Sequence, residues 1–279
     1  MTEKGIDIST WQGTDVNFSE LKRQGYTFVI MRIGFGGFSN GFYCTEDNAF
    51  EENYPKAKAA GLKIGGYWYA GARNVNEAES EAEFCIKWLK NKQFDLPIFY
   101  DVEEKHMLEM QNSQLDNIVN TFCSKLLRNK YYAGIYGGFA LTGKLTATTR
   151  NKYPVWFAQW NSECQYSGHY DVWQYTDRLR LPGVTGGNLD GDYLYKDYTS
   201  IIRDKGYNNF SVKKSEPVIS SKSYLQLAFE VIEGKYGVGN ERKQKLGAKY
   251  SNVQDIVNAL LFDSGVYLKF KALHDRGLL

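Results

Sequence analysis

Residues 96–103 read Leu-Pro-Ile-Phe-Tyr-Asp-Val-Glu, an apolar run that ends in two acidic residues. The run is typical of a buried strand, and successive side chains of a strand point to opposite faces. Asp101 and Glu103 are therefore predicted on one face, and Tyr100 and Val102 on the other. Two carboxyl groups on one partly buried face raise each other's pKa and separate the two values. Such a pair can hold a proton near neutral pH, although either acid could instead cap a following helix.

Strand-like and helix-like segments alternate around this one over residues 1–200. The strand candidates are Gly5–Ile8, Phe28–Ile33, Ile64–Tyr69, Pro97–Val102, Tyr131–Tyr136, Val155–Gln159 and Asp171–Tyr175. The helix candidates lie around Phe18–Gln24, Asp47–Ala60, Asn76–Lys90 and Ser113–Lys130. This alternation predicts a parallel sheet with crossover helices, and the number of repeats favours a closed α/β barrel. We expect the barrel to be irregular, because the gaps between strands shorten in its last third.

The pattern changes after the barrel, and three parts are predicted: the barrel over 1–204, a linker over 205–222 and a small all-α domain over 223–279. The linker segment mixes Asn, Ser and Lys and shows little periodicity. Apolar residues then recur at helical spacing as far as Phe262, which predicts three short helices. Residues 213–279 carry 11 Lys and Arg against 7 Asp and Glu. This excess suits an anionic surface, and ordinary surface chemistry explains it equally well.

Several classes of protein are not indicated by the composition. The four cysteines, Cys44, Cys85, Cys123 and Cys164, have no CxxC spacing, and the three histidines are dispersed. The sequence therefore predicts no disulfide framework and no metal or organic cofactor. It has no apolar run that could span a bilayer and no leader-like segment after Met1. We expect synthesis in the cytoplasm, and neither nucleic acid nor membrane as a partner.

Acidic residues also stand near the ends of other strand candidates. Asp7 ends the first candidate, and Asp190 could end the last strand of the barrel. Catalytic residues of α/β barrels lie at the carboxyl ends of several strands and meet at one rim. The quartet Asp7, Asp101, Glu103 and Asp190 is therefore predicted to form one acidic rim, although each acid alone could be a cap or turn residue. Asp192 could share the face of Asp190.

Aromatic residues accompany these acids in a chain with 21 Tyr, 16 Phe and 6 Trp. Flat rings with polar edges can cover sugar faces, so we expect a polysaccharide-binding cleft, with core packing as the alternative for each ring. The rings near strand ends are Trp11, Tyr67, Tyr69, Tyr100, Tyr136, Trp156, Trp160, Trp173 and Tyr175. Among them, the candidate substrate-binding residues are Tyr67, Tyr136, Trp173, Trp11 and Trp156.

A nucleotide site is a competing interpretation. The segment Gly138–Lys144 matches the GxxxxGK part of a phosphate-binding loop. Leu145 stands where the magnesium-binding hydroxyl is required, so nucleotide binding is not predicted.

Taken in order, these motifs resemble those of the glycoside hydrolase family 25 lysozymes, the muramidases of bacteria and their phages. The resemblance covers about residues 4–198. The matching segments are Gly5–Ser9, Trp11–Gly13, Tyr100–Glu103, Val155–Gln159, Trp173–Thr176 and Gly187–Asp190. It implies a modified α/β barrel that cleaves the β-1,4 bond between N-acetylmuramic acid and N-acetylglucosamine in peptidoglycan. It also implies that Glu103 is the acid/base and that Asp101 orients or stabilises the reacting sugar.

The resemblance favours retention of configuration with help from the substrate's own N-acetyl group, and a covalent enzyme intermediate is the alternative. Many relatives have His at the position of Thr10, and Tyr-His-Phe in place of Tyr67–Tyr69, which affects details of the rim. A chitinase is less well supported, because the acidic run DxxDxDxE is missing. A barrel that binds carbohydrate without cleaving it is the alternative from another class of protein.

Leu225–Leu261 resembles a cell-wall-binding repeat found at the C-termini of some phage lysozymes. With the barrel, this repeat predicts a phage endolysin that reaches the bacterial cell wall after release from the host, and a bacterial autolysin is the alternative. A single repeat would bind the wall better in an oligomer, because linked sites raise the effective concentration. Oligomerisation is therefore a further expectation.

Overall fold

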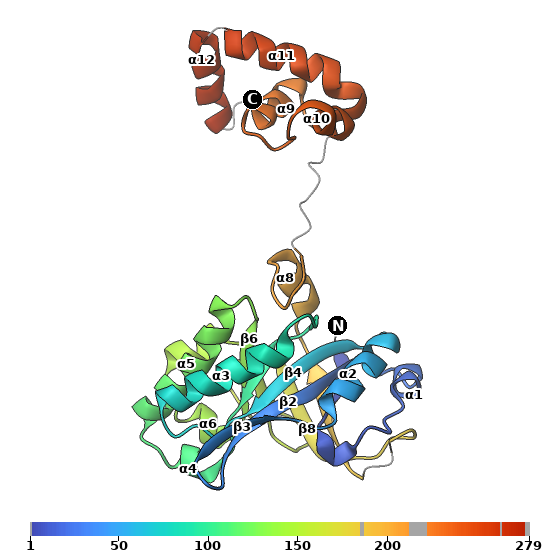
Figure 1. Ribbon diagram of the computed structural model, residues 1–279, viewed down its shortest axis with the longest axis vertical. Helices are drawn as coiled ribbons and strands as arrows, with labels where there is room; N and C mark the ends of the chain where they lie inside the picture. The colour runs from blue at the N-terminus through green and yellow to red at the C-terminus, as the bar shows by residue number, and fades with distance from the viewer. Residues whose placement is uncertain (1, 185–186, 212–221, 263, 277–279) are drawn as a thin grey trace. The chain divides into compact units, whose positions relative to one another are not determined.

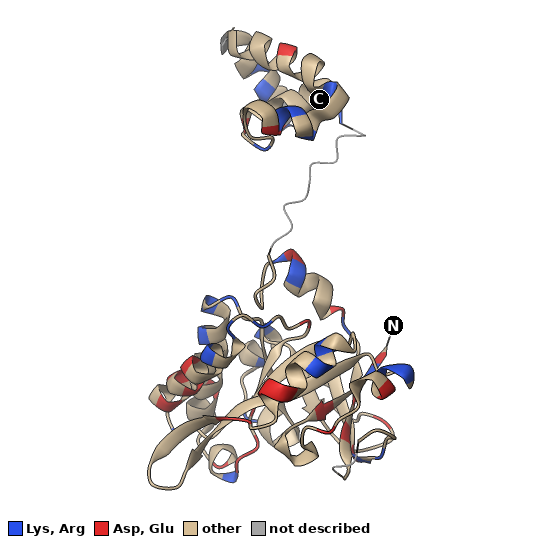
Figure 2. Ribbon diagram, turned by 45° about the vertical axis from the view of Figure 1, so that its right-hand side comes forward, with Lys and Arg blue, Asp and Glu red and all other residues tan. Residues whose placement is uncertain are grey.

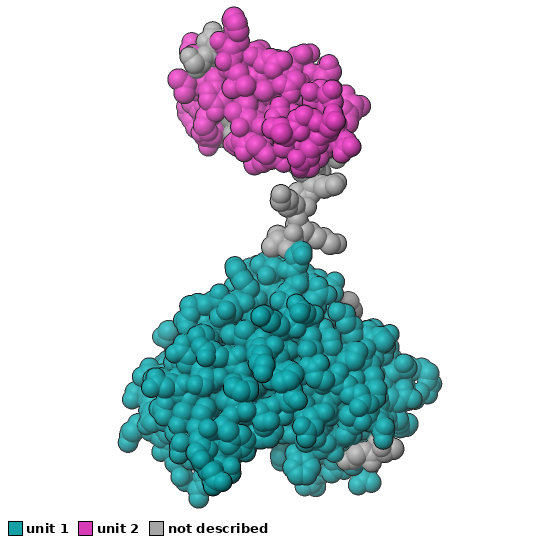
Figure 3. All heavy atoms as spheres, viewed as in Figure 1, with its two compact units in different colours: residues 1–212 teal, residues 213–279 magenta. Residues whose placement is uncertain are grey.

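The computed structural model describes residues 2–184, 187–211, 222–262 and 264–276. The chain forms two compact units, residues 1–212 and 213–279, here called the barrel unit and the helical unit (Figure 3). Among the described residues, no helix is long and apolar enough to cross a membrane.

The barrel unit is built on one sheet that closes on itself (Figure 1). Its strands are β1 (Glu3–Ile8), β2 (Phe28–Phe38), β3 (Phe42–Glu46), β4 (Lys63–Tyr69), β5 (Ile98–Asp101), β6 (Ala133–Gly137), β7 (Val155–Ala158), β8 (Val172–Leu179) and β9 (Leu189–Leu194). They follow the order β1-β9-β8-β7-β6-β5-β4-β2-β3, and a parallel β1–β2 pair closes the ring. β9 is antiparallel to both of its neighbours, and β3 forms a hairpin with β2 outside the ring. The predicted irregular α/β barrel is confirmed.

Helices cover the outside of the barrel, and both signs of charge are interspersed over them (Figure 2). They are η1 (Thr10–Gln12), α1 (Phe18–Arg23), α2 (Phe50–Ala59), α3 (Val75–Leu89), α4 (Lys105–Leu108), α5 (Asn112–Arg128), α6 (Phe139–Thr142), α7 (Ala147–Lys152) and α8 (Tyr198–Asp204). As expected, those in the last third of the barrel unit are short. The side chain of Asn74 caps α3 by accepting a hydrogen bond from the Glu77 amide.

Side-chain alternation divides the apolar residues between two cores. Tyr100 points outward, where its ring stacks on Phe122 of α5 with centroids 3.9 Å apart. Phe99 points inward and contacts Trp156 at 5.3 Å. Because Tyr100 points outward, the next residue, Asp101, must point inward.

The predicted boundary between barrel and linker is wrong for residues 205–211. Asn208 is fully buried, and its side-chain amide donates to the carbonyl oxygens of Phe94 and Leu96, each at 3.0 Å. Tyr207 and Phe210 pack against the inner core. Polar composition suggested a linker here, but the asparagine satisfies backbone groups of the barrel. The rest of the expected linker, except Lys222, lies outside the described residues.

The helical unit has its own core and one helix more than the predicted three. It consists of α9 (Tyr224–Ile232), α10 (Gly239–Leu246), η2 (Gly247–Lys249), α11 (Tyr250–Phe262) and α12 (Ser264–Asp275). The additional α12 packs through Tyr267, whose ring lies 6.1 Å from that of Phe229. The apolar pattern of the sequence predicted no helix after Phe262, and the described side chains of α12 are exposed or only partly buried.

Candidate active site

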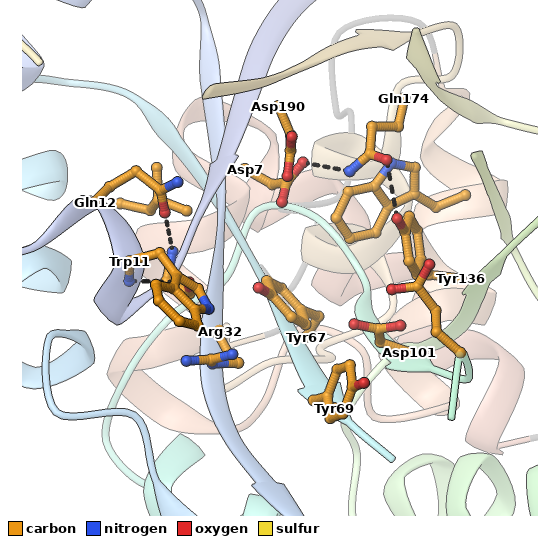
Figure 4. A pocket seen from close by; sticks show the side chains of 14 residues that line it. Asp7, Trp11, Gln12, Arg32, Tyr67, Tyr69, Asp101, Tyr136, Gln174 and Asp190 are labelled. Carbon is orange, nitrogen blue, oxygen red and sulfur yellow. Dashed lines mark hydrogen bonds between the residues drawn. The ribbon is translucent and has the colours of Figure 1, made fainter. Parts of the chain in front are cut away.

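A hollow of about 200 Å³ opens where the parallel strands end, and all four predicted acids line it. Figure 4 shows the carboxyl groups of Asp7 and Asp190 together on one side and that of Asp101 nearer Tyr69. The predicted acidic rim is thus brought together by strands that are far apart in sequence. Its members are Asp7 of β1, Asp101 of β5, Glu103 just after β5, and Asp190 of β9.

Asp101 and Glu103 differ in exposure although they share the hollow. β5 ends at Asp101, whose residue is only 4% exposed. Glu103 lies beyond the strand, on the wall of the hollow, and is open to solvent. The amide of Val102 still donates to the Tyr136 carbonyl at 3.2 Å, which keeps this segment against β6. The pair therefore combines one buried and one accessible carboxyl group.

Asp190 reaches the rim in a different way from the one expected. It does not end a strand; it is the second residue of β9. Because β9 runs antiparallel to β1, its beginning lies at the rim where the parallel strands end, and Asp190 pairs in register with Asp7. Gly187–Asp190 carries too little periodicity to indicate an antiparallel strand.

Gln174 of β8 fixes the position of Asp7 and was not among the predicted site residues. Its side-chain amide donates to Asp7 Oδ2 at 2.9 Å. Its oxygen accepts hydrogen bonds from Tyr136 Oη at 2.9 Å and from Trp160 Nε1 at 3.0 Å. Gln174 and Trp173 are neighbours in the strand, so their side chains point to opposite faces. The period-two pattern of this strand could therefore have shown that one of the two points into the barrel.

Asp192 lies beneath Asp7 and is fully buried. Its Oδ1 accepts a hydrogen bond from Trp156 Nε1 at 2.8 Å. Among the described residues, no hydrogen-bond partner reaches its Oδ2. Burial raises the pKa of Asp192 to about 8, so the two carboxyl groups hold a proton between them near neutral pH.

The pKa values of all four rim acids are raised, and burial is the largest cause in each case. The charges of Asp192 and Asp190 add to the rise for Asp7, and that of Glu103 adds to the rise for Asp101. Arg32 opposes the rise for Asp101. The pKa of Asp190 reaches about 6. An acid with a raised pKa keeps its proton closer to neutral pH, as a general acid must.

Four of the five predicted aromatic residues line the hollow: Tyr67, Tyr136, Trp11 and Trp156. Trp11 is 79% exposed, whereas Trp156 is buried in the floor. The prediction for Trp173 is wrong, because it faces outward. Its indole nitrogen donates to the Gln159 carbonyl at 2.8 Å, and its ring packs with Tyr175 and Tyr193.

Arg32 of β2 and Tyr69 of β4 also line the hollow. Tyr69 was among the rings expected near strand ends, whereas Arg32 was not predicted. Arg32 follows Ile30 by two positions, so both face the inside of the barrel. Tyr69 Oη donates to Glu104 Oε1 at 2.9 Å. Among the described residues, no group of three or more His, Cys, Asp or Glu side chains is placed to hold a metal ion.

The buried proton of Asp192 predicts a pH dependence of stability. The pKa of Asp192 rises from 3.8 in the unfolded chain to about 8 in the fold. The protonated carboxyl group therefore contributes its full stabilisation below pH 3.8, and this contribution is lost as the pH rises through 8. Asp192→Asn stays neutral, so its Tm relative to wild type should increase between pH 4 and 8. Each kcal/mol corresponds to about 2–4 °C in a domain of this size. Calorimetry of the thermal unfolding of the barrel unit measures the difference in Tm. A difference that does not change with pH, which is the result expected for the exposed control Asp204→Asn, contradicts the interpretation.

Comparison with known families gives two matches. A family model described as "Glycosyl hydrolases family 25" matches residues 6–184. A second one, the CW_7 repeat, matches residues 226–261 in the helical unit.

Individual relatives agree with the first of these matches. An autolytic lysozyme of Clostridium acetobutylicum is 29% identical over 184 residues, which cover 66% of this chain and 53% of that protein. The chain thus matches about half the length of this curated relative. The lysozyme structure from Streptomyces coelicolor has a TM-score of 0.59 at 22% identity and covers 75% of this chain and 98% of that one. The CTP1L endolysin structure has a TM-score of 0.61 at 22% identity and covers 72% and 69%. At these identities, both structures show a common fold.

Proposed function

The chain belongs to the glycosyl hydrolases family 25, and we propose that it cleaves the β-1,4 bond between N-acetylmuramic acid and N-acetylglucosamine in peptidoglycan. The observation that carries this proposal is the accessible Glu103 beside the buried Asp101, in a hollow with two further carboxyl groups. A barrel that only bound carbohydrate would have no use for four carboxyl groups whose pKa values are raised.

Glu103 is the proposed general acid. Burial raises the pKa of Glu103, and bound sugar favours the protonated form further by displacing the remaining water around its carboxyl group. As the glycosidic bond breaks, Glu103 gives its proton to the leaving oxygen. The resulting carboxylate then takes a proton from the water that attacks in the second step.

Asp101 is the proposed partner of the substrate's N-acetyl group. In its ionised form it accepts a hydrogen bond from the acetamido N–H, so the carbonyl oxygen becomes a better nucleophile toward the anomeric carbon. That oxygen bonds to the anomeric carbon as the leaving oxygen departs, which closes a ring through the N-acetyl group. Water then attacks the anomeric carbon from the opposite face and opens this ring. Two inversions give retention. Direct attack by Asp101 is the covalent alternative.

Asp7 and Asp190 have a supporting role in this proposal. Their oxygens complete the wall that faces the positive charge developing on the sugar, and Asp190, with a pKa of about 6, adds negative charge to it at neutral pH. This electrostatic arrangement is fixed before the substrate arrives. Gln174 holds Asp7 in place, and Tyr67 and Trp11 offer rings to the sugar faces. The mechanism uses side chains and substrate alone, without cofactor or metal.

Mass spectrometry of the fragments released from purified cell walls tests the proposed bond. Cleavage by a muramidase leaves N-acetylmuramic acid at the new reducing end, and retention gives the β-anomer first, which NMR detects. Fragments that end in N-acetylglucosamine, or release of peptide without new reducing ends, contradict the proposal. Chitin as a parallel substrate separates this activity from that of a chitinase.

We propose that the helical unit binds the cell wall, because the CW_7 match covers α9–α11. A chain that ends at residue 212 should keep its kcat on soluble peptidoglycan fragments but bind walls at least about tenfold more weakly. Each unit has its own core, so the shortened chain should fold. Pull-down with insoluble walls measures binding, and equal retention of both chains contradicts the assignment. Light scattering of the full chain tests the expected oligomer.

The setting proposed is that of a phage endolysin, made in the host cytoplasm and acting on the wall after release. The fold shared with the CTP1L endolysin and the wall-binding repeat support this setting. A bacterial autolysin would use the same chemistry.

A further inference from the structure

Arg32 lies where two hollows meet. It lines the acidic hollow described above and a second one of about 710 Å³, which extends over the β2–β3 hairpin past Phe38 and Tyr43. Figure 4 shows Arg32 below Trp11, on the other side of Tyr67 from Asp101. The two hollows share Trp11, Arg32 and Tyr69, so a ligand that occupies both passes these three side chains.

One edge of the Arg32 guanidinium is fixed by the protein. Nε donates to Asp47 Oδ2 at 2.7 Å. Buried Asp47 also accepts hydrogen bonds from the amides of Thr10 at 3.0 Å and Ala49 at 2.9 Å. Within the described part of the chain, the two terminal nitrogens of Arg32 have no hydrogen-bond partner, although its side chain is only 13% exposed. The protein therefore orients the guanidinium and leaves its outer donors free.

Arg32 also differs in charge from the other residues that line the two hollows. Among the described residues that line either hollow, it alone is positively charged. The first hollow contains the four rim acids, and the second contains Glu46, Asp47 and Glu104. The carboxylates of both hollows repel an anionic group on a bound glycan, and among the described lining residues Arg32 supplies the positive charge that attracts it.

Peptidoglycan carries such a group and chitin does not. Both polymers have N-acetyl groups, but only muramic acid carries a lactyl ether at C3 that ends in a carboxyl group. C3 is adjacent to C2, which bears the N-acetyl group assigned to Asp101, and Arg32 lies close enough to Asp101 to lower its pKa. The planar fork of arginine suits a carboxyl group, to which it donates two parallel hydrogen bonds.

On the basis of the proposed function, we propose that Arg32 binds the lactyl carboxyl group of the muramic acid at the cleaved bond. Arg32 would thereby select muramyl glycans over chitin. A peptide attached to that group would continue into the hairpin hollow. In peptide-bearing glycan the carbonyl oxygen still accepts a hydrogen bond from Arg32, without the added attraction of a free carboxylate.

The test measures binding, by calorimetric titration of full-length protein in the Glu103→Gln background, so that no ligand is cleaved. The two ligands are a peptide-free tetrasaccharide of alternating N-acetylglucosamine and N-acetylmuramic acid, and chitotetraose. Adding Arg32→Gln should weaken binding of the muramyl ligand about 10- to 100-fold, as expected for loss of charge-assisted hydrogen bonds, and should leave chitotetraose nearly unchanged. Arg32→Lys keeps the charge next to Asp47 and should give an intermediate loss.

Arg23→Gln is the matched control, because Arg23 also pairs with a carboxylate, Glu20, but on the exposed surface of α1. Equal effects of Arg32→Gln on both ligands, or no effect on either, overturn the assignment of Arg32 while the proposed function stands. Failure of both ligands to bind the Glu103→Gln protein contradicts the proposed function itself. Thermal denaturation confirms that each variant is folded.

Discussion

The Glu103→Gln variant is expected to bind cell walls normally and to release reducing sugars about 10²–10⁴-fold more slowly than wild type. Glutamine has nearly the same shape and hydrogen-bonding reach, but it cannot give up a proton to the leaving oxygen. Glu103 is exposed and carries none of the side-chain hydrogen bonds recorded among the described residues, so the fold should tolerate the change. The loss should therefore appear in kcat, with little change in wall binding.

Glu109→Gln is the control for this variant. Glu109 lies six residues further along, is exposed, and forms an ion pair with Lys105 of α4 at 3.6 Å. Its substitution removes one carboxylate from the same segment and should leave kcat unchanged. Lysis by Glu103→Gln at the wild-type rate would show that Glu103 is not the acid.

The second large effect is expected for Asp101→Asn, which should reduce kcat about 10²–10³-fold, a loss typical for one preorganised electrostatic group. An amide cannot supply the negative charge that polarises the N-acetyl group. Stability should move in the opposite direction. Asp101 is buried, its Oδ1 has no hydrogen-bond partner among the described residues, and its raised pKa means that ionisation at neutral pH destabilises the fold.

A neutral asparagine avoids this cost, so the Tm of Asp101→Asn at pH 7 should equal or exceed that of wild type. Activity on soluble fragments and calorimetry on the same preparation separate the two effects. A variant that loses activity together with Tm would make Asp101 a structural residue, and one that cleaves as fast as wild type would remove it from the mechanism. Asp204→Asn, an exposed change in α8, should affect neither measurement.

The segment at residues 96–103 was sufficient to predict one buried strand of the barrel and half of the acidic quartet. The alternation of a strand is enough to place Tyr100 and Asp101 on opposite faces, and the packing of Tyr100 on Phe122 shows that Asp101 faces inward. The same rule left Trp173 and Gln174 undecided, because an aromatic residue fits the outer core as well as a sugar-binding cleft. Only the contacts of Trp173 with Tyr175 and Tyr193 decide that Gln174 faces the site.

The sequence by itself determined the strand and helix alternation, the two units, and the chemical character of Asp101 and Glu103, because these depend on local periodicity and residue type. Tertiary structure alone decided three features: the antiparallel β9 that brings Asp190 to Asp7, the burial of Asn208 against the barrel, and the position of Arg32 between two hollows. Each depends on pairing between segments distant in the chain. Local patterns carry little information about such pairing, because it is set by closure of the whole sheet. The carboxyl pair at the end of β5 is therefore readable in the sequence, whereas the charges that surround it become visible only when the barrel closes.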